Sequence, residues 1–409
     1  MKRWVLLLAA VSMLSVFRAA IALPFSAFDP RSFAMGGTGV ASGTSANASF
    51  YNPGLLAAAR DHDDFSLEFP VVAVRLSDPD ELMNSADDFN NANYMDNFNN
   101  AVDAFNANPS AANKNALVAS ATSLEAGLLT LSNKAIEGEA NAAMVIGIPS
   151  KRFGAAFYTN AWVVGGGEGF VSSQDIDTIN QLINDVNNGS TSVTNPTTNF
   201  TSAMDARFAL LIETGISLAT QVNIGGQDIG VGITPKYVRV QTYDYQFTGE
   251  NLDNAKVSLD TGKKTDSNFN LDMGLAKDFG NGWRTGLVVK NIVPKTYTTV
   301  LGNQVKVEPQ ARVGVAHQTS LTTIAADLDL TENKPVGFDT KTQYLGVGAE
   351  FDAWRFAQLR VGYRYNIAAS NTSVATAGIG LSPFGVHLDL TVEGSSNEVG
   401  ASLQLGFRF

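Results

Sequence analysis

Charged side chains occupy alternate positions in several segments of this sequence that have the pattern of β-strands. In one of them, Arg360 and Arg364 share a face, while Leu359 and Val361 share the other. Two arginines on one face could bind a carboxylate-bearing ligand. Such charges could instead pair with one another, because buried charges need partners, and we expect mutual pairing. The candidate inward-facing charges are Arg207, Glu213, Asp272, Arg312, Asp327, Asp329, Glu350, Arg360, Arg364, Asp389 and Arg408.

No combination of residues predicts an enzyme active site or a metal site. The chain has no cysteine, and its histidines, His62, His317 and His387, have no second histidine at ligand spacing. The Asp- and Asn-rich stretch 78–99 lacks the pattern of a calcium-binding EF-hand loop, and the glycine run 165–169 is expected to be a flexible loop hinge rather than a phosphate-binding loop. We therefore expect a protein that is not an enzyme and that holds neither a cofactor nor a metal ion.

The composition is compatible with a membrane barrel but does not by itself decide the fold class. Lysine and arginine number 28 against 39 aspartates and glutamates, so the formal net charge is −11. An acidic chain argues against binding to nucleic acid, because phosphate neutralisation needs clustered cations. The mean hydropathy of +0.00 is too polar for a helical membrane protein, but it suits a barrel in which every second strand residue meets lipid. A secreted β-sandwich could share this composition.

A series of segments alternates between apolar and polar residues with a period of two. In the last of them, Ala401, Leu403 and Leu405 oppose Ser402 and Gln404. The predicted strands are Phe65–Leu76, Glu139–Ile148, Arg152–Val164, Ala206–Leu218, Asp228–Phe247, Asn268–Asp278, Gly282–Val293, Val307–Gln318, Leu321–Leu330, Thr342–Glu350, Ala357–Ile367, Val374–Leu381, Gly385–Glu393 and Val399–Phe409. The expected fold is all-β, an antiparallel transmembrane barrel of about 14 strands.

The connections between these strands set the expected orientation. Links after odd-numbered strands are mostly long, such as 77–138 and 165–205, whereas links after even-numbered strands are short, such as 149–151. Outer-membrane barrels have long loops outside and short turns in the periplasm, so both termini should be periplasmic. Two long loops, about 78–133 and 170–200, have helical periodicity, and we expect short helices that cap the outer mouth.

The fifth predicted strand breaks its own alternation. Ile233 and the apolar residues before it share one face, but Val238 and Val240 fall on the other. Because proline cannot donate a ladder hydrogen bond, a β-bulge in the barrel wall is the simplest account, and such a bulge could open a lateral exit. The candidate bulge residues are Pro235, Lys236 and Tyr237.

Residues 1–22 have the pattern of an export signal peptide. Two cations, Lys2 and Arg3, precede an apolar stretch, and Ala20-Ile21-Ala22 has the small residues of a cleavage site. We therefore divide the chain into a signal peptide (1–22), an N-terminal hatch (23–64) and an outer-membrane barrel (65–409).

Residues 23–64 are glycine-rich and lack the alternating pattern of β-strands. Their apolar content, which includes Phe33 and Phe50, favours a packed plug over a disordered tail. The candidate hatch motif comprises Met35, Gly36, Gly37, Gly39, Asn52, Pro53 and Gly54. With the strand pattern, this segment resembles the FadL family of outer-membrane transporters for long-chain fatty acids and hydrophobic compounds. In that family an N-terminal hatch carries Asn-Pro-Ala, where this chain has glycine as the third residue.

A closer resemblance is to the TraF-like branch, known as conjugal transfer proteins. The matching pieces are Ala34–Gly37, Gly232–Tyr237, Thr242–Tyr245 and Val288–Asn291. The thioredoxin-like protein that shares the TraF name is excluded, because this chain has no cysteine.

These resemblances imply a Gram-negative outer-membrane protein that takes up small hydrophobic molecules, similar to long-chain fatty acids, through a plugged barrel. The alternative is a non-transporting structural component of a conjugal transfer or other envelope assembly. Expected partners are outer-membrane lipid and lipopolysaccharide, a hydrophobic ligand, and the barrel-assembly machinery, which would contact the terminal strand ending in Phe409.

Overall fold

The computed structural model describes residues 23–58, 65–248, 262–338, 340–353, 356–369 and 372–408. The expected signal peptide, His62 and Phe409 lie outside these ranges. The barrel strands are β1 (Ser66–Ser77), β2 (Ala135–Ile148), β3 (Gly154–Phe170), β4 (Ala203–Ile224), β5 (Gln227–Thr248), β6 (Lys263–Asp278), β7 (Trp283–Lys290), β10 (Gln310–Gln318), β11 (Thr322–Asp329), β12 (Tyr344–Ala353), β13 (Ala357–Asn366), β14 (Val374–Leu381), β15 (Val386–Gly394) and β16 (Glu398–Arg408).

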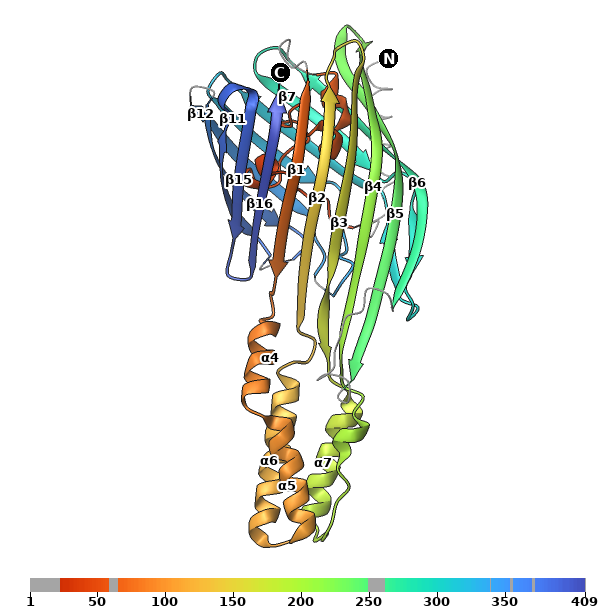
Figure 1. Ribbon diagram of the computed structural model, residues 1–409, viewed down its shortest axis with the longest axis vertical. Helices are drawn as coiled ribbons and strands as arrows, with labels where there is room; N and C mark the ends of the chain where they lie inside the picture. Colours follow the sequence, from red (N-terminus) through yellow and green to blue (C-terminus); the bar gives the residue numbers. More distant parts are fainter. Residues whose placement is uncertain are drawn as a thin grey trace, which may run out of the picture.

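These fourteen strands close into one antiparallel barrel (Figure 1). Each pairs with its neighbours in chain order, β7 pairs with β10, and β1 pairs with β16 to complete the ring. The predicted strand number and the all-β barrel class are confirmed.

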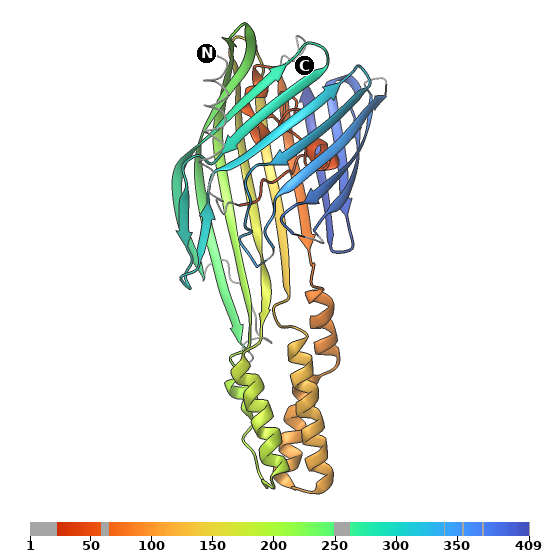
Figure 2. The same ribbon diagram turned by 180° about the vertical axis from the view of Figure 1, so that it is seen from behind.

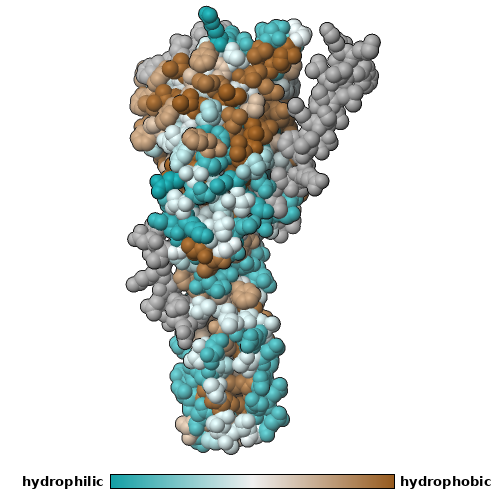
Figure 3. Space-filling view, turned by 90° about the vertical axis from the view of Figure 1, so that its right-hand side faces the viewer, coloured by the Kyte–Doolittle hydropathy of each residue, from teal (hydrophilic) through white to brown (hydrophobic). Residues whose placement is uncertain are grey.

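The alternating sequence pattern becomes an inside and an outside. On β15, Leu388, Leu390 and Val392 are exposed on the outer surface, whereas His387 and Asp389 are buried in the lumen. An apolar outer face is the surface that a bilayer covers. In Figure 3 the apolar surface gathers on the barrel, away from the helices.

The barrel is much taller on one side than on the other (Figures 1 and 2). Strands β4 and β5 have 22 residues each, whereas β11 has 8 and β15 has 9. At ~3.3 Å per residue, the long strands reach about 70 Å and the short ones about 30 Å. We call the end with the short connections the turn end and the opposite end the helical end.

The glycine run of β3 is part of a strand, contrary to the expected loop hinge. Gly166 pairs with Glu137 on one side and with Arg207 on the other, so the ladder continues through the run. A Cβ atom on Gly166 would lie 1.9 Å from the carbonyl oxygen of Ile136. The missing side chain therefore lets neighbouring main chains approach closely.

Two connections at the helical end carry the helices, which form a projecting bundle rather than the expected cap (Figures 1 and 2). The elements are α4 (Leu82–Asn91), α5 (Tyr94–Ala107), α6 (Ala111–Leu129), α7 (Ser173–Asn187) and the 3-10 helix η2 (Pro196–Asn199). Their apolar faces bury one another, with Phe98, Phe105 and Leu124 at the centre. None of the helices among the described residues is long and apolar enough to cross a membrane.

At the helical end, the lumen contains a hairpin that the sequence pattern did not predict. Strands β8 (Lys295–Thr298) and β9 (Gln304–Val307) pair only with each other. The Tyr297 hydroxyl donates to the Oδ1 atom of Asn268 at 2.5 Å, and Tyr297 is buried. This places the hairpin against the inner face of β6.

The predicted bulge at Pro235, Lys236 and Tyr237 is wrong. The register of β5 is constant across this point, with Thr234 opposite Asp272 and Lys236 opposite Asn270 on β6. The alternation breaks because Val238 and Val240 face the lumen although they are apolar. The register shift that β1 makes with both neighbours lies between Glu68 and Val71.

The N-terminal segment lies inside the barrel, where Figure 1 shows its short helices in red. It contains α2 (Pro30–Ala34), α3 (Ala48–Tyr51) and the 3-10 helix η1 (Pro53–Leu56). Every residue of these three helices is buried. We use the name hatch for residues 23–58. A further 3-10 turn, η4 (Pro383–Gly385), joins β14 to β15.

Candidate functional site: the barrel lumen and its hatch

The hatch folds through local caps that its sequence encodes. Asp29 accepts a hydrogen bond from the Ser32 amide at 3.3 Å and so caps α2. Asn52 accepts one from the Gly54 amide at 3.0 Å and caps η1. A proline occupies the first turn of both helices, where no amide donor is needed. Short caps of this kind give the segment a defined shape without strands.

One side of the hatch rests on glycines of β12 and β13. A Cβ atom on Gly348 would lie 2.4 Å from the carbonyl oxygen of Met35, and one on Gly362 would lie 2.3 Å from the Gly36 amide nitrogen. Gly36 itself has a φ of +68°, which L-residues with side chains rarely adopt. The predicted motif residues Met35 and Gly36 therefore make main-chain contact with the wall.

The second contact is made by Asn52, Pro53 and Gly54 on β5 and β6. A Cβ atom on Gly232 would lie 2.4 Å from the carbonyl carbon of Pro53. The Asn52 side chain donates to the carbonyl oxygens of Val40 at 2.8 Å and Leu275 at 2.9 Å, which ties the hatch to itself and to the wall.

Gly54, the third residue of this motif, is itself closely surrounded by main-chain atoms of the wall. A Cβ atom on Gly54 would lie 2.9 Å from the Gly230 carbonyl oxygen and 3.0 Å from the Gly274 carbonyl oxygen. That crowding accounts for glycine at this position, where FadL-family hatches carry alanine.

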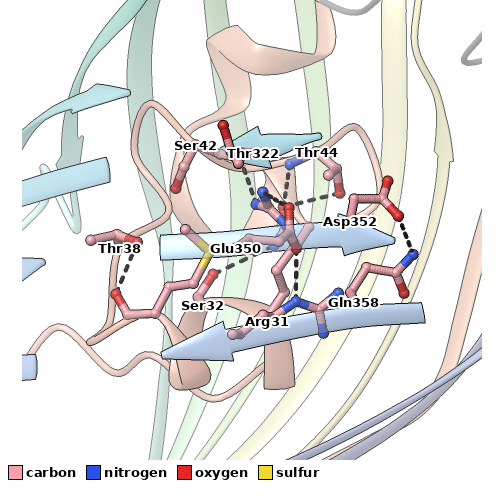
Figure 4. Close-up of polar contacts among 12 residues, drawn as sticks. Arg31, Ser32, Thr38, Ser42, Thr44, Thr322, Glu350, Asp352 and Gln358 are labelled. Atoms are coloured by element: carbon pink, nitrogen blue, oxygen red, sulfur yellow. Dashed lines mark hydrogen bonds and ion pairs between the residues drawn. The ribbon is translucent and has the colours of Figure 1, made fainter. Parts of the chain in front are cut away.

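A buried ion-pair network joins the hatch to the wall (Figure 4). Arg31 of α2 donates two hydrogen bonds to the Glu350 carboxylate, both at 2.9 Å. Glu350 also accepts from Arg360 at 2.7 Å, and Arg360 donates to Asp389 at 2.5 Å. A third donor of Arg31 reaches the Ser42 carbonyl oxygen at 2.6 Å. The predicted wall charge Glu350 thus bridges Arg360 and a hatch arginine that the strand pattern could not reveal.

A second ion-pair network joins side chains of β1, β2, β13, β15 and β16 inside the barrel. Arg364 pairs with Glu398, and with Glu393 at 3.5 Å. Arg75 pairs with Glu139, Glu393 and Glu398. Arg360 and Arg364 therefore belong to different networks, and each guanidinium already holds carboxylates. The proposed two-arginine site for a ligand carboxylate is not assembled in this state.

On the neighbouring strands β10 and β11, two charged residues, Arg312 and Asp327, hold the glycine segment of the hatch. Asp327 accepts hydrogen bonds from the amides of Gly39 at 2.7 Å and Val40 at 2.9 Å. Arg312 donates to Asp329 at 2.6 Å and to the Gly37 carbonyl oxygen at 3.1 Å. The carbonyl oxygen of Gly37 and the amide of Gly39, both in the predicted motif, thus form hydrogen bonds with charged wall residues.

The remaining predicted charges also have partners. Lys236 lies 3.1 Å from both Glu213 and Asp272, and Arg207 lies 3.5 Å from Asp244. Lys236 was expected in a bulge and is instead an inward ion-pair partner. The side chain of Arg408 lies outside the described part of the chain.

Several important residues were not among the predicted site residues. They are Arg31, Glu68, Arg75, Glu139, His387, Glu393 and Glu398. His387 and Glu393 could have been found from the alternation of β15, since both stand on its polar face. Arg31 lies outside any strand and gave no such signal.

A small polar cavity lies on the turn side of the hatch. It has a volume of about 220 Å³ and is lined by Arg31, Ser42, Asn47, Arg284 and Asp389, among others. These side chains suit water and ions rather than an apolar molecule.

Toward the helical end, the lumen becomes apolar. Val238 and Val240 of β5 pack with Trp162 on β3 and with Val305 and Val307 of the hairpin. The Leu23 main chain accepts a hydrogen bond from Gln310, and its side chain is part of the same cluster. We call this set the apolar chamber, comprising Leu23, Trp162, Val164, Ala209, Leu211, Val238, Val240, Tyr297, Val305, Val307 and Val336. These buried side chains pack against one another and form the apolar part of the lumen.

The fold and sequence place the chain among known proteins. The family model described as "F plasmid transfer operon, TraF, protein" matches residues 49–329. The chain belongs to this family. A search of curated protein sequences gives no match.

Solved barrels with the same architecture include transporters of hydrophobic compounds. The toluene transporter TbuX of Ralstonia pickettii is similar over 94% of this chain and 99% of its own, with 15% identity and a TM-score of 0.51. The toluene transporter TodX of P. putida covers 94% and 99%, with 12% identity and a TM-score of 0.50. A FadL homologue of Pseudomonas aeruginosa covers 95% and 99%, with 9% identity and a TM-score of 0.51. At these identities the likeness defines a FadL-like barrel fold.

Proposed function

We propose that this protein is an outer-membrane channel that takes up small hydrophobic molecules through the hatch-filled barrel. The observation that carries the proposal is the apolar chamber, which is buried inside a lumen whose other half is lined by ion pairs. A soluble ion would gain nothing from such a chamber, whereas an apolar molecule would be removed from water there. The solved barrels of the same fold that are named toluene transporters support this substrate class.

In this proposal the turn end faces the periplasm, and residues 1–22 direct export. A ligand enters at the helical end by displacing the β8–β9 hairpin and occupies the apolar chamber. Passage then requires the hatch to leave its glycine contacts, its ion pair with Glu350 and its main-chain hydrogen bonds to Asp327. Recognition of the last strand by the barrel-assembly machinery belongs to the same proposal.

The experiment is uptake of radiolabelled toluene and of a long-chain fatty acid by cells that lack their own uptake channel. Val238 is completely buried in the chamber. Val238→Asp places a carboxylate there and should lower the uptake rate about tenfold, while Val238→Ile keeps the chamber apolar and should change uptake little. Heat-modifiable gel migration verifies that both variants form barrels. Equal uptake by Val238→Asp and the unchanged chain, or uptake no faster than in cells without the protein, would remove the transporter proposal.

A second candidate is a structural role in a conjugal transfer assembly. The match to the transfer-operon family and the bundle projecting from the barrel favour it. Replacing residues 79–133 with a short turn should then abolish plasmid transfer while leaving hydrophobe uptake intact, and Val238→Asp should do the reverse. Transfer at the normal frequency without the bundle would count against this role.

A further inference from the structure

The outer faces of the described barrel strands carry very few formal charges. By alternation and register, the charged residues that point outward are Arg239, Lys263 and Lys277. All three are cations, although the chain as a whole has a net charge of −11. By the same alternation, acidic side chains of these strands point inward. On the described strands, the charged side chains that face outward are therefore all positive.

Arg239 and Lys263 lie where the apolar band ends toward the helical end. On the turn side of Arg239, Tyr237 packs edge-to-face on Phe269, with ring centroids 5.5 Å apart, and Phe269 is 78% exposed. Such aromatic pairs mark the border between hydrocarbon and headgroups. Arg239 is the next outward residue on β5, so its guanidinium emerges at headgroup level.

Lys263 lies farther from the hydrocarbon than Arg239. It pairs with Tyr243 in the β5–β6 ladder, four residues beyond Arg239. Four strand residues correspond to about 13 Å along the strand. Neither cation forms an ion pair with any residue in the described part of the chain. Two cations with no ion-pair partner among the described residues thus stand at two depths on one strip of the wall.

On the helical-end side of Arg239, the same strip carries aromatic rings. Phe208 of β4 stacks on Tyr243 with ring centroids 4.5 Å apart, and Tyr245 stacks on Phe247 with centroids 5.9 Å apart. Stacked amphipathic rings suit a wet, sugar-rich layer, because their faces are apolar and the tyrosine hydroxyls can form hydrogen bonds.

We propose that this strip, formed by Arg239, Lys263 and the rings of Phe208, Tyr245 and Phe247, binds lipopolysaccharide. Arg239 contacts a phosphate of the lipid A disaccharide, Lys263 contacts a phosphate of the inner core, and the rings lie against core sugars. An ordinary phosphoglyceride carries its phosphate in one thin layer and could satisfy only the lower cation. The two depths therefore favour a tall, multiply phosphorylated glycolipid. The proposal rests on the orientation given under the proposed function.

Lys277 supplies a matched control. It is also an outward cation of β6, but it lies near the turn end, where its ammonium group donates to the Asp228 carbonyl oxygen at 3.0 Å. The variants Arg239→Gln/Lys263→Gln and Lys277→Gln remove charge from opposite borders of the same apolar band.

The test measures lipid retained by the full-length purified barrel after detergent exchange and gel filtration. The probes are rough-type lipopolysaccharide and, separately, phosphatidylglycerol. The double variant should retain at least about tenfold less lipopolysaccharide than the unchanged chain, whereas Lys277→Gln should retain as much. Retention of phosphatidylglycerol by the double variant should fall much less than retention of lipopolysaccharide, because this lipid reaches only Arg239.

Three results would overturn the proposal. They are unchanged lipopolysaccharide retention by the double variant, an equal loss in Lys277→Gln, and a parallel loss of phosphatidylglycerol, which would indicate general attraction to anionic lipid. Heat-modifiable migration confirms that each variant is folded. Because retention is measured on purified protein, its outcome is independent of the cellular uptake assay.

Discussion

The two halves of the lumen are closed by different kinds of interaction. At the turn end, main-chain atoms of the hatch lie on wall glycines, and wall charges hold it with directional hydrogen bonds. At the helical end, the β8–β9 hairpin packs its valines against the apolar chamber and is anchored by hydrogen bonds of Tyr297 and Thr299. Directional contacts at close range tolerate little displacement, whereas apolar contacts can be remade with a ligand. The difference indicates that the helical-end half is the easier one to open.

The largest effect is expected when a side chain is added at one of the wall glycines that contact the hatch. A Cβ atom at position 274 would lie 2.0 Å from Oδ1 of Asn52. Gly274→Val should therefore displace the hatch and cost about 3 kcal/mol, and ion conductance across a planar bilayer should rise. A matched control is Gly138→Val, where the nearest atom to a new Cβ is 3.6 Å away. Equal effects in the two variants would show that hatch contact is not the cause.

Removing one charge from the Arg31–Glu350–Arg360 network should have the next largest effect. Glu350→Gln deprives two buried guanidinium groups of a carboxylate, although each keeps one other acceptor, and should cost about 2 kcal/mol of unfolding free energy. The loss of stability is measured by the temperature at which the band of the folded, compact barrel disappears on a gel. Glu332→Gln breaks an ion pair with Lys341, whose side chain is 54% exposed, and should cost below about 1 kcal/mol. A cost for Glu350→Gln no greater than this would mean that the network does not hold the hatch.

The smallest effect is expected at the helical end. The Thr299 hydroxyl donates to Asp244 at 2.5 Å and anchors the hairpin to β5. Thr299→Val should destabilise the protein by about 1–2 kcal/mol and raise hydrophobe uptake, because the hairpin moves more easily, without raising ion conductance. Thr265→Val, at an exposed position of β6, serves as the control. A rise in ion conductance in Thr299→Val would show that the two halves open together.

The sequence predicted the strands well because a barrel wall imposes a period of two on every strand. Arg207, Glu213, Asp272, Arg312 and Asp327 point inward for this reason alone. Their partners could not be predicted, because pairing depends on strand register and on the hatch. Arg31 is the clearest case, since its contact with Glu350 joins residues 319 positions apart.

Two failures have a common physical origin. Val238 and Val240 are apolar because they line the chamber, yet apolar residues on a barrel strand normally indicate lipid. The pattern therefore suggested a bulge at Pro235. The β8–β9 hairpin escaped prediction because its strands have four residues each, too few for a period to be visible.

The direction of the helices was a separate failure. Helical periodicity shows which face of a helix is buried, but it does not show what buries it. In this protein the helices bury their apolar faces against one another, through residues such as Phe98 and Ile179. They therefore need no contact with the barrel mouth and project away from it.

The glycine contacts of the hatch have an evolutionary consequence. Since Gly232, Gly348 and Gly362 touch main-chain atoms, the fit hardly depends on which side chains the hatch carries. Hatch sequences can therefore diverge between homologues while the wall glycines stay fixed. Distant relatives of this protein should be easier to trace by the spacing of inward glycines in their strands than by the sequence of the plug itself.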